Sequence, residues 1–175
     1  YNLEAPVLSE ETQNRLRAVL QPHCPIKNPV DLAGTPEHDM WVFDRSLEIL
    51  LADPDIDGVI IVGLYGGYKD LSDEFAKLEM DVAKSMADHI ARSGKPVVMH
   101  SIYQPQHPES LQYLSEHGVP LFDSVQTAVR AMGALVEYSQ SRRQLQEEMD
   151  APAPDLPADR MEKANEIFAK VRSEG

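Results

Sequence analysis

The sequence predicts an α/β protein with a doubly wound, mainly parallel sheet of the flavodoxin-like kind. Two observations predict this fold: segments with strand character alternate with amphipathic helical segments, and residues 58–64 (GVIIVGL) are almost entirely apolar. Such an apolar run suits a strand that is buried on both faces of a parallel sheet. The alternation suits helices that cover that sheet. We expect about four strands.

The first part of the chain is expected to form one strand and two helices. Residues 3–8 have the character of a short strand, and Ser9 caps a helix that carries two acidic residues in its first turn. A loop over residues 23–34 leads to Thr35 and Pro36, a pair that suits the start of a second helix. Apolar residues at helical spacing continue this helix to residue 51.

The same alternation continues after residues 58–64. A long helix begins near Ser72 and closes at Gly94, because its apolar residues recur every three or four positions up to that glycine. Residues 96–102 form the next strand and residues 108–117 a short helix. A last strand at 119–122 leads into a helix from residue 125.

The end of the chain has a different composition. Residues 150–158 (DAPAPDLPA) are rich in proline, which keeps a linker extended. We therefore expect three parts: a flavodoxin-like domain over residues 1–149, a linker over 150–158, and a helix over 159–175. The apolar side of that last helix needs a partner surface, either on this domain or on a following one.

The front of the expected domain looks incomplete. A flavodoxin-like sheet places its first strand centrally, but residues 3–8 resemble an outer strand and no Gly-rich first turn precedes them. Either the strand order differs, or the chain lacks the first strand and helix of its domain. In the second case residues 3–8 and 58–64 flank a slot. Unpaired buried backbone groups cost about 1–3 kcal/mol each, so we expect another polypeptide to supply the missing central strand.

Composition excludes several classes of function. The formal net charge of −13 disfavours binding to nucleic acids and to anionic membranes. No apolar run approaches the roughly 20 residues that span a bilayer. Cys24 is the only cysteine, so no intrachain disulfide forms, and a reducing cytoplasm is the expected location.

Two loops carry the candidate binding residues. One is NPVDLAG, residues 28–34, and the other is LYGGY, residues 64–68, directly after the most apolar strand. Ligands of open α/β sheets collect at the carboxyl ends of the strands, and paired glycines let the backbone approach an anion closely. The alternative is that Gly66-Gly67 is only a turn and that Asn28 only satisfies its own loop.

Four segments together resemble a known family. NPVDLAGTPE, LLADPDIDGVIIVGLYGG, SGKPVV and EHGVPLFDSVQTAVRAMGALVEY occur in this order and are similar to the ligase domain of NDP-forming acyl-CoA synthetases. That family includes ADP-forming acetyl-CoA synthetases and is related to succinyl-CoA synthetase. The resemblance covers residues 3–138. In fused members, a linker and helix like those at the end of this chain lead into an ATP-grasp domain.

The resemblance implies an acid–thiol ligase that converts a carboxylic acid, CoA and a nucleoside triphosphate into acyl-CoA, nucleoside diphosphate and phosphate. The reaction passes through an acyl phosphate and a phosphohistidine. CoA and ATP or GTP, with Mg, are expected to bind mainly to other domains of the enzyme, which are therefore partners of this chain.

The resemblance also assigns residues. The positions that face the small carboxylic acid substrate in the family match Asn28, Asp31, Gly34, Gly66 and Gly67. The chain lacks the Gly-rich turn that precedes the catalytic helix, and none of its six histidines has the setting of the phosphorylated one. The catalytic histidine is expected elsewhere in the enzyme, and this chain alone is expected to be inactive.

Other candidates are weaker. His100 ends a strand, where it either contacts an anion or forms a local hydrogen bond at the rim. No metal site is expected, because His23 and Cys24 lack a second ligand pair, and the Asp53, Asp55, Asp57 run reads as a solvated turn without the glycine and glutamate of a calcium loop. A non-catalytic flavodoxin-like module that binds a small molecule or regulates another protein is the alternative function. A flavin domain is disfavoured, since the Ser/Thr-rich phosphate loop is missing.

Overall fold

In the part of the chain that the structure describes, three parallel strands form a sheet in the order β1-β2-β3. They are β1 (Val59–Gly63), β2 (Val97–Ser101) and β3 (Leu121–Phe122). The register pairs Val59 with Val97 and Met99 with Leu121. The computed structural model describes residues 3–151 and 158–174. Its α/β class and parallel sheet confirm the predicted flavodoxin-like fold.

Helices follow the strands as the periodicity predicts. The described helices are α1 (Glu10–Val19), α2 (Val42–Ala52), α3 (Asp73–Ser93), α4 (Glu109–Glu116), α5 (Val125–Asp150) and α6 (Ala158–Glu174), with 3₁₀ turns η1 (Thr35–Glu37), η2 (Tyr68–Asp70) and η3 (Gln104–Gln106). The Ser9 hydroxyl accepts the Thr12 amide, and the Ser72 hydroxyl accepts the Phe75 amide. Gly94 ends α3 in the left-handed conformation, at φ 66°. These caps are the ones expected from the sequence.

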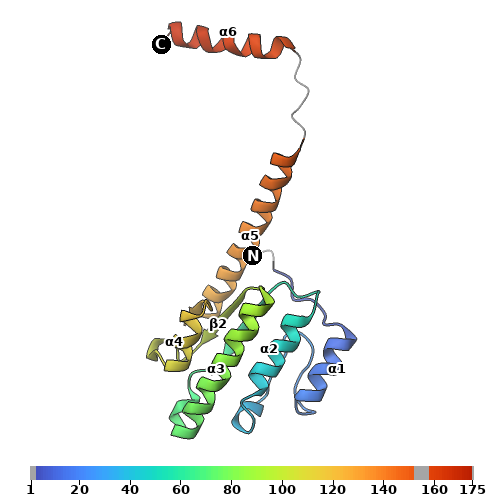
Figure 1. Cartoon of the computed structure of the whole chain (residues 1–175), viewed down its shortest axis with the longest axis vertical. Helices are drawn as coiled ribbons and strands as arrows, with labels where there is room; N and C mark the ends of the chain where they lie inside the picture. The colour runs from blue at the N-terminus through green and yellow to red at the C-terminus, as the bar shows by residue number, and fades with distance from the viewer. Residues whose placement is uncertain (1–2, 152–157, 175) are drawn as a thin grey trace. The chain divides into compact units, whose positions relative to one another are not determined.

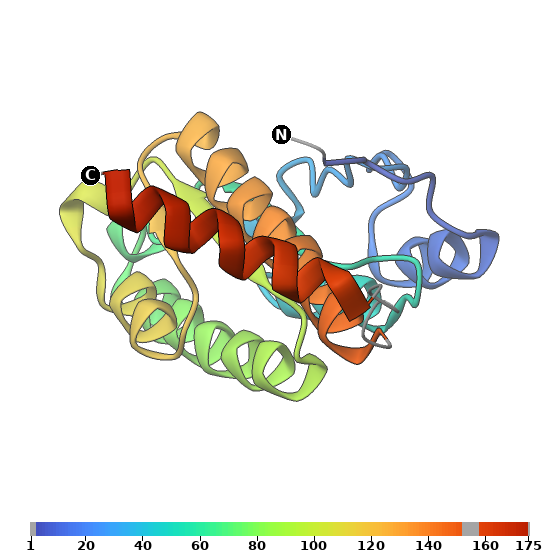
Figure 2. The same cartoon turned by 90° about the horizontal axis from the view of Figure 1, so that it is seen from above.

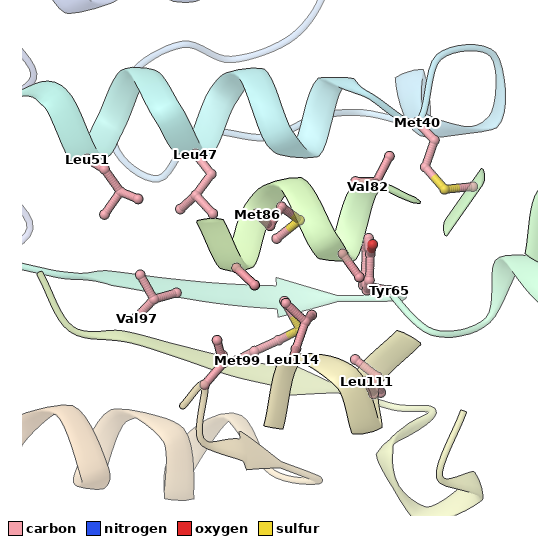
Figure 3. Packing of buried hydrophobic residues seen from close by; sticks show 13 residues of the cluster. Met40, Leu47, Leu51, Tyr65, Val82, Met86, Val97, Met99, Leu111 and Leu114 are labelled. Atoms are coloured by element: carbon pink, nitrogen blue, oxygen red, sulfur yellow. The ribbon is translucent and has the colours of Figure 1, made fainter. Parts of the chain in front are cut away.

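The helices lie on both faces of the sheet. Figure 1 shows α1, α2, α3 and α4 side by side, and each contacts the next. Met99 faces the core beneath α3 and α4, together with Val82 and Leu114 (Figure 3). Val98 points to the opposite face and packs against Met132 of α5. Figure 2 shows β2 between α3 and the first turns of α5.

A second cluster joins α1 to α2. Its buried members are Leu8, Leu16, Leu20, Cys24, Val42, Ile49 and Ile56. Leu16 and Val42 are fully buried, so α1 is held to the domain by its apolar stripe. Burial of a leucine side chain contributes about 1.5–3 kcal/mol.

The predicted strand at residues 3–8 is wrong, and the sheet has three strands among the described residues rather than about four. Residues 3–8 form no strand, and they do not pair with β1. Leu3 and Leu8 instead pack into two different apolar clusters. Side-chain packing therefore holds this segment, together with hydrogen bonds from the Asn28 and Gln13 side chains to the carbonyls of Pro6 and Leu8.

One edge of β1 is open as a result. The Val59 amide donates to Pro96 O, and Gly63 O accepts from the Ile102 amide, so alternate residues 59, 61 and 63 face β2. Ile60 and Val62 therefore direct their backbone groups to the other side. Within residues 3–151 and 158–174, no backbone group bonds to them there.

The start of the second helix also differs from the expectation. Thr35 and Pro36 begin the short turn η1 rather than α2, which starts only at Val42. The predicted linker lies mostly at residues 152–157, outside the described residues, and its first residue, Asp150, still belongs to α5.

The chain divides into two compact units, Tyr1–Tyr138 and Ser139–Gly175. The first contains the sheet, and the second contains the last turns of α5 and all of α6. In α6, exposed Met161, Phe168 and Val171 recur at helical spacing, as the sequence predicts. The predicted domain boundary at residue 149 stays a prediction. None of the helices described is both long and apolar enough to cross a membrane.

Candidate functional site

The Gly66-Gly67 turn lies directly beyond the carboxyl end of β1. Tyr65, the residue before it, is buried and held at both ends: its hydroxyl donates to Glu79 O at 2.6 Å, and its carbonyl accepts from Ser101 Oγ at 2.5 Å. Phe43 of α2 packs edge-on against the Tyr65 ring, with 5.0 Å between ring centroids. The turn therefore starts from a fixed point between α2, α3 and β2.

The amide groups of the turn already have partners inside the protein. The Gly66 amide donates to Glu79 Oε1 at 2.6 Å, and the Tyr68 amide donates to the same oxygen at 3.4 Å. The Gly67 amide donates to Leu64 O at 3.1 Å. A buried carboxyl group thus takes the place that an external anion would occupy at these amides.

Both glycines are also required by packing. Gly66 has φ +99°, and a Cβ on it would lie 2.8 Å from Leu111 Cδ1 and 2.9 Å from Pro108 Cγ. A Cβ on Gly67 would collide with the Tyr103 ring. Absence of side chains here lets the turn approach α4 and the segment after β2.

Sequence reasoning missed Glu79, although a signal for it was present. Glu79 lies on the apolar stripe of α3, four residues after Phe75 and three before Val82, and only 1% of it is exposed. Burial raises the pKa of its carboxyl group, while the Gly66 and Tyr68 amides, Ser110 and Lys69 offset part of that rise. An acidic residue on a buried helical face needs a polar partner, and the partner is the glycine turn.

The loop at residues 28–34 has its own internal order. Asn28 Nδ2 donates to Pro6 O at 3.2 Å, and Asp31 Oδ1 accepts the Ala33 amide at 2.9 Å. Gly34 adopts φ +77°, and nothing lies within 4 Å of the position that a Cβ would take. In the described part of the chain, no hydrogen bond or ion pair connects this loop to Gly66-Gly67. The structure therefore places the five candidate residues in two separately braced loops.

Tyr68 lies directly after the glycine turn, and the charge of Glu37, shortly after the loop at residues 28–34, acts on it. Burial, with the negative charge of Glu37 in η1 as the next cause, raises the pKa of Tyr68 to about 12. Tyr68 also packs edge-on against Phe43, at 6.2 Å between ring centroids. The turn after residue 34 and the Gly66-Gly67 turn thus belong to the same end of the sheet.

His100 is not the rim residue that the sequence suggests. It lies within β2, opposite Val62 and Phe122, and is 8% exposed. Its Nδ1 atom has no hydrogen-bond partner among the described residues. Among the residues that the structure describes, no group of three or more His, Cys, Asp or Glu residues could hold a metal ion.

The family follows from a comparison with known proteins. The family model of the Ligase-CoA domain matches residues 4–146, most of the chain. The chain belongs to the Ligase-CoA domain family. This confirms the resemblance carried by its motifs, including the NPVDLAG and LYGG segments.

Two relatives define the scope of that similarity. The chain is 24% identical over 135 residues to the alpha subunit of an ADP-forming acetate–CoA ligase II from Pyrococcus furiosus, covering 77% of this chain and 28% of the relative. It also matches the crystal structure of PH0766 from Pyrococcus horikoshii OT3, with a TM-score of 0.54 and 22% identity over 70% of this chain and 27% of that one. This Ligase-CoA domain therefore spans a little over a quarter of the length of these relatives.

Proposed function

We propose that this chain is a segment of an NDP-forming acyl-CoA synthetase, in which it contributes to binding of the acyl or phosphate group. Membership of the Ligase-CoA domain family carries this proposal. The glycine turn supports it, because ligands of open α/β sheets bind at the carboxyl ends of the strands. The reaction joins a small carboxylic acid to CoA at the expense of ATP or GTP.

The proposed binding residues are Gly66 and Gly67 after β1, and Asn28, Asp31 and Gly34 in the preceding loop. We assign the phosphohistidine, and the sites for CoA, nucleotide and Mg, to other domains or subunits of a cytoplasmic enzyme. His100 is kept only as a secondary candidate, since its ring is buried in the sheet.

The isolated chain is predicted to lack acyl-CoA synthetase activity. Incubation with acids, CoA and ATP should give no thioester above background, while the complete synthetase that contains the chain forms it. Turnover by the isolated chain would contradict the placement of the catalytic histidine elsewhere. Lack of turnover by the complete protein with every acid would contradict the proposed function.

Gly67→Ala tests whether the turn faces the substrate. In the complete synthetase we expect the KM for the acid to rise by about tenfold, because a displacement near 1 Å at a binding loop is enough for such a loss. The collision with Tyr103 would produce a similar loss by an indirect route. The double variant Gly67→Ala/Tyr103→Ser removes that collision.

Tyr103→Ser alone is the matched control for this experiment. If the Gly67 Cβ obstructs substrate, the double variant keeps the elevated KM while Tyr103→Ser stays near the parent. If the double variant instead returns to the Tyr103→Ser value, Gly67 serves packing only, and the turn loses its assignment to the substrate.

We also propose that another segment of the synthetase pairs with the open edge of β1. Ile60 and Val62 turn their backbone groups outward there, and the Val62 side chain is 52% exposed. Unpaired strand edges readily accept a further strand. A parallel strand from outside this chain would satisfy both residues.

Hydrogen exchange measures that pairing directly. The Ile60 and Val62 amides should exchange quickly in the isolated chain and become protected in the complete synthetase. The amide of Ile61, which faces β2, is the internal control and should be protected in both. Equal exchange of Val62 in the two samples would rule out an added strand.

A further inference from the structure

Glu79 lines a cavity of about 370 Å³, and its carboxyl group also accepts the Gly66 amide of the glycine turn. The cavity lies between η2 and the starts of α3 and α4, and Glu79 and Ser110 are buried residues of its lining. Its charged lining residues Lys69, Asp73 and Glu109 are all exposed. Glu79 and Ser110 thus form the buried polar part of the lining, and the other charged residues lie at its exposed part.

Glu79 accepts three hydrogen bonds from residues 65–68, two through its carboxyl group and one through its backbone carbonyl. Its Oε1 atom accepts the Gly66 and Tyr68 amides, which fixes both ends of the Gly66-Gly67 turn. Its own carbonyl accepts the Tyr65 hydroxyl. Ser110 lines the same cavity and lowers the pKa of the Glu79 carboxyl group, but its Oγ atom has no hydrogen-bond partner among the described residues.

We propose that Glu79 is a positioning residue of the substrate loop: its carboxyl group accepts the inward amides of the Gly66-Gly67 turn and so fixes the backbone that faces the substrate. This inference rests on the proposed function of the turn. The turn then shapes the site through close approach of its backbone, and the charge of the substrate is met by groups outside the turn.

The surroundings of Glu79 set how its protonation responds to pH. The net effect of the environment is a raised pKa, with burial as the main cause. The titratable groups around it, from its own helix and from the neighbouring elements, are Tyr65, Tyr68, Lys69, Asp73, His107 and Glu109. Protonation leaves Oε1 able to accept both amides, so the turn survives neutralisation of Glu79.

Nuclear magnetic resonance tests the contact on the 175-residue chain itself. The Gly66 and Tyr68 amide signals should shift together with pH, reporting one carboxyl group with a pKa above that of an ordinary glutamate. Glu79→Gln should abolish this shift and leave the rest of the spectrum in place. Amides that titrate unchanged in Glu79→Gln, or that do not titrate at all, would overturn the contact.

Kinetics of the complete synthetase test the positioning role. Glu79→Gln keeps an acceptor oxygen and should retain the parent KM for the acid. Glu79→Ala releases the turn and should raise that KM by about tenfold, with the KM values for CoA and nucleotide unchanged. Ser110→Ala is the control, because Ser110 lines the same cavity but does not bond to the turn amides. Its KM for the acid should stay near that of the parent.

The outcomes separate the competing explanations. A lower KM for the acid in Glu79→Ala would mean that substrate uses the amides and that Glu79 competes with it, which overturns the proposal. An unchanged KM with only reduced stability would assign Glu79 a purely structural role, which also overturns it. Absence of acyl-CoA formation in every variant and in the parent refutes the proposed function, while the amide titration still decides whether Glu79 holds the turn.

Discussion

Gly66→Ala is expected to lower the free energy of unfolding by about 2–4 kcal/mol, through left-handed strain and overpacking together. Gly66 has φ +99°, and the added Cβ would lie 2.8–2.9 Å from the Leu111 and Pro108 side chains. Leu111 is 1% exposed, so it has little room to move. Urea unfolding followed by circular dichroism measures the change.

Gly118→Ala is the matched control for Gly66→Ala. Gly118 also has positive φ, +87°, but nothing lies within 4 Å of the position of a Cβ. Its alanine variant therefore isolates the backbone strain, about 1–2 kcal/mol. The two variants should differ by the packing contribution. Equal losses would mean that α4 moves aside without resistance, and the close approach of the turn would lose its importance for stability.

The strand and helix alternation was readable because each element carries its own periodicity. β1 and β2 are short apolar runs, and α3 repeats apolar residues every three or four positions between Ser72 and Gly94. The segment at residues 3–8 has the composition of a strand as well. Strand formation, however, also requires a neighbour for backbone hydrogen bonds, and no local pattern reports whether that neighbour exists.

The place of the Gly66-Gly67 turn in the fold was predictable, but its internal partners were not. Gly66-Gly67 after an apolar strand marks the carboxyl end of the sheet, which the fold rule alone locates. Which groups meet its amides depends on α3, where Glu79 lies thirteen residues after Gly66. Spacing within one helix shows that Glu79 faces inward, but only the packing of α3 against the turn shows what it contacts.

Asp53, in the acidic run after α2, also has buried partners that the local sequence does not reveal. The run reads as a solvated turn, yet Asp53 is 3% exposed. Its Oδ2 accepts the Thr12 hydroxyl at 2.5 Å, its Oδ1 accepts the Asp55 amide at 2.9 Å, and its carbonyl accepts Lys95 Nζ at 2.6 Å. Asp53 thus connects α1, the end of α2 and the segment before β2.

Asp53→Ala is expected to destabilise the domain by about 2–4 kcal/mol, because it leaves the buried Thr12 hydroxyl and the Asp55 amide without their charged acceptor. Asp57→Ala is the control from the same acidic run. Its side chain is exposed, and its loss should change the free energy of unfolding by no more than about 0.5 kcal/mol. Similar effects of the two variants would mean that Asp53 adds no more to stability than an exposed residue of a solvated turn, as the sequence suggests.

The pH dependence of the free energy of unfolding, compared between the parent protein and Asp53→Ala, gives a second, independent measurement. The hydrogen bond from Thr12 is the largest cause that lowers the pKa of Asp53, and the Asp55 amide and Lys95 act in the same direction against burial. A carboxyl group with a lowered pKa in the folded state stabilises the protein fully above its unfolded pKa. That stabilisation is lost as the pH falls through the folded-state pKa. The stability difference between the parent and Asp53→Ala should therefore be constant near neutral pH and shrink in acid. A difference that stays the same down to acid pH would mean that Asp53 acts through packing alone, and that the ionised carboxylate is not what joins α1 to α2.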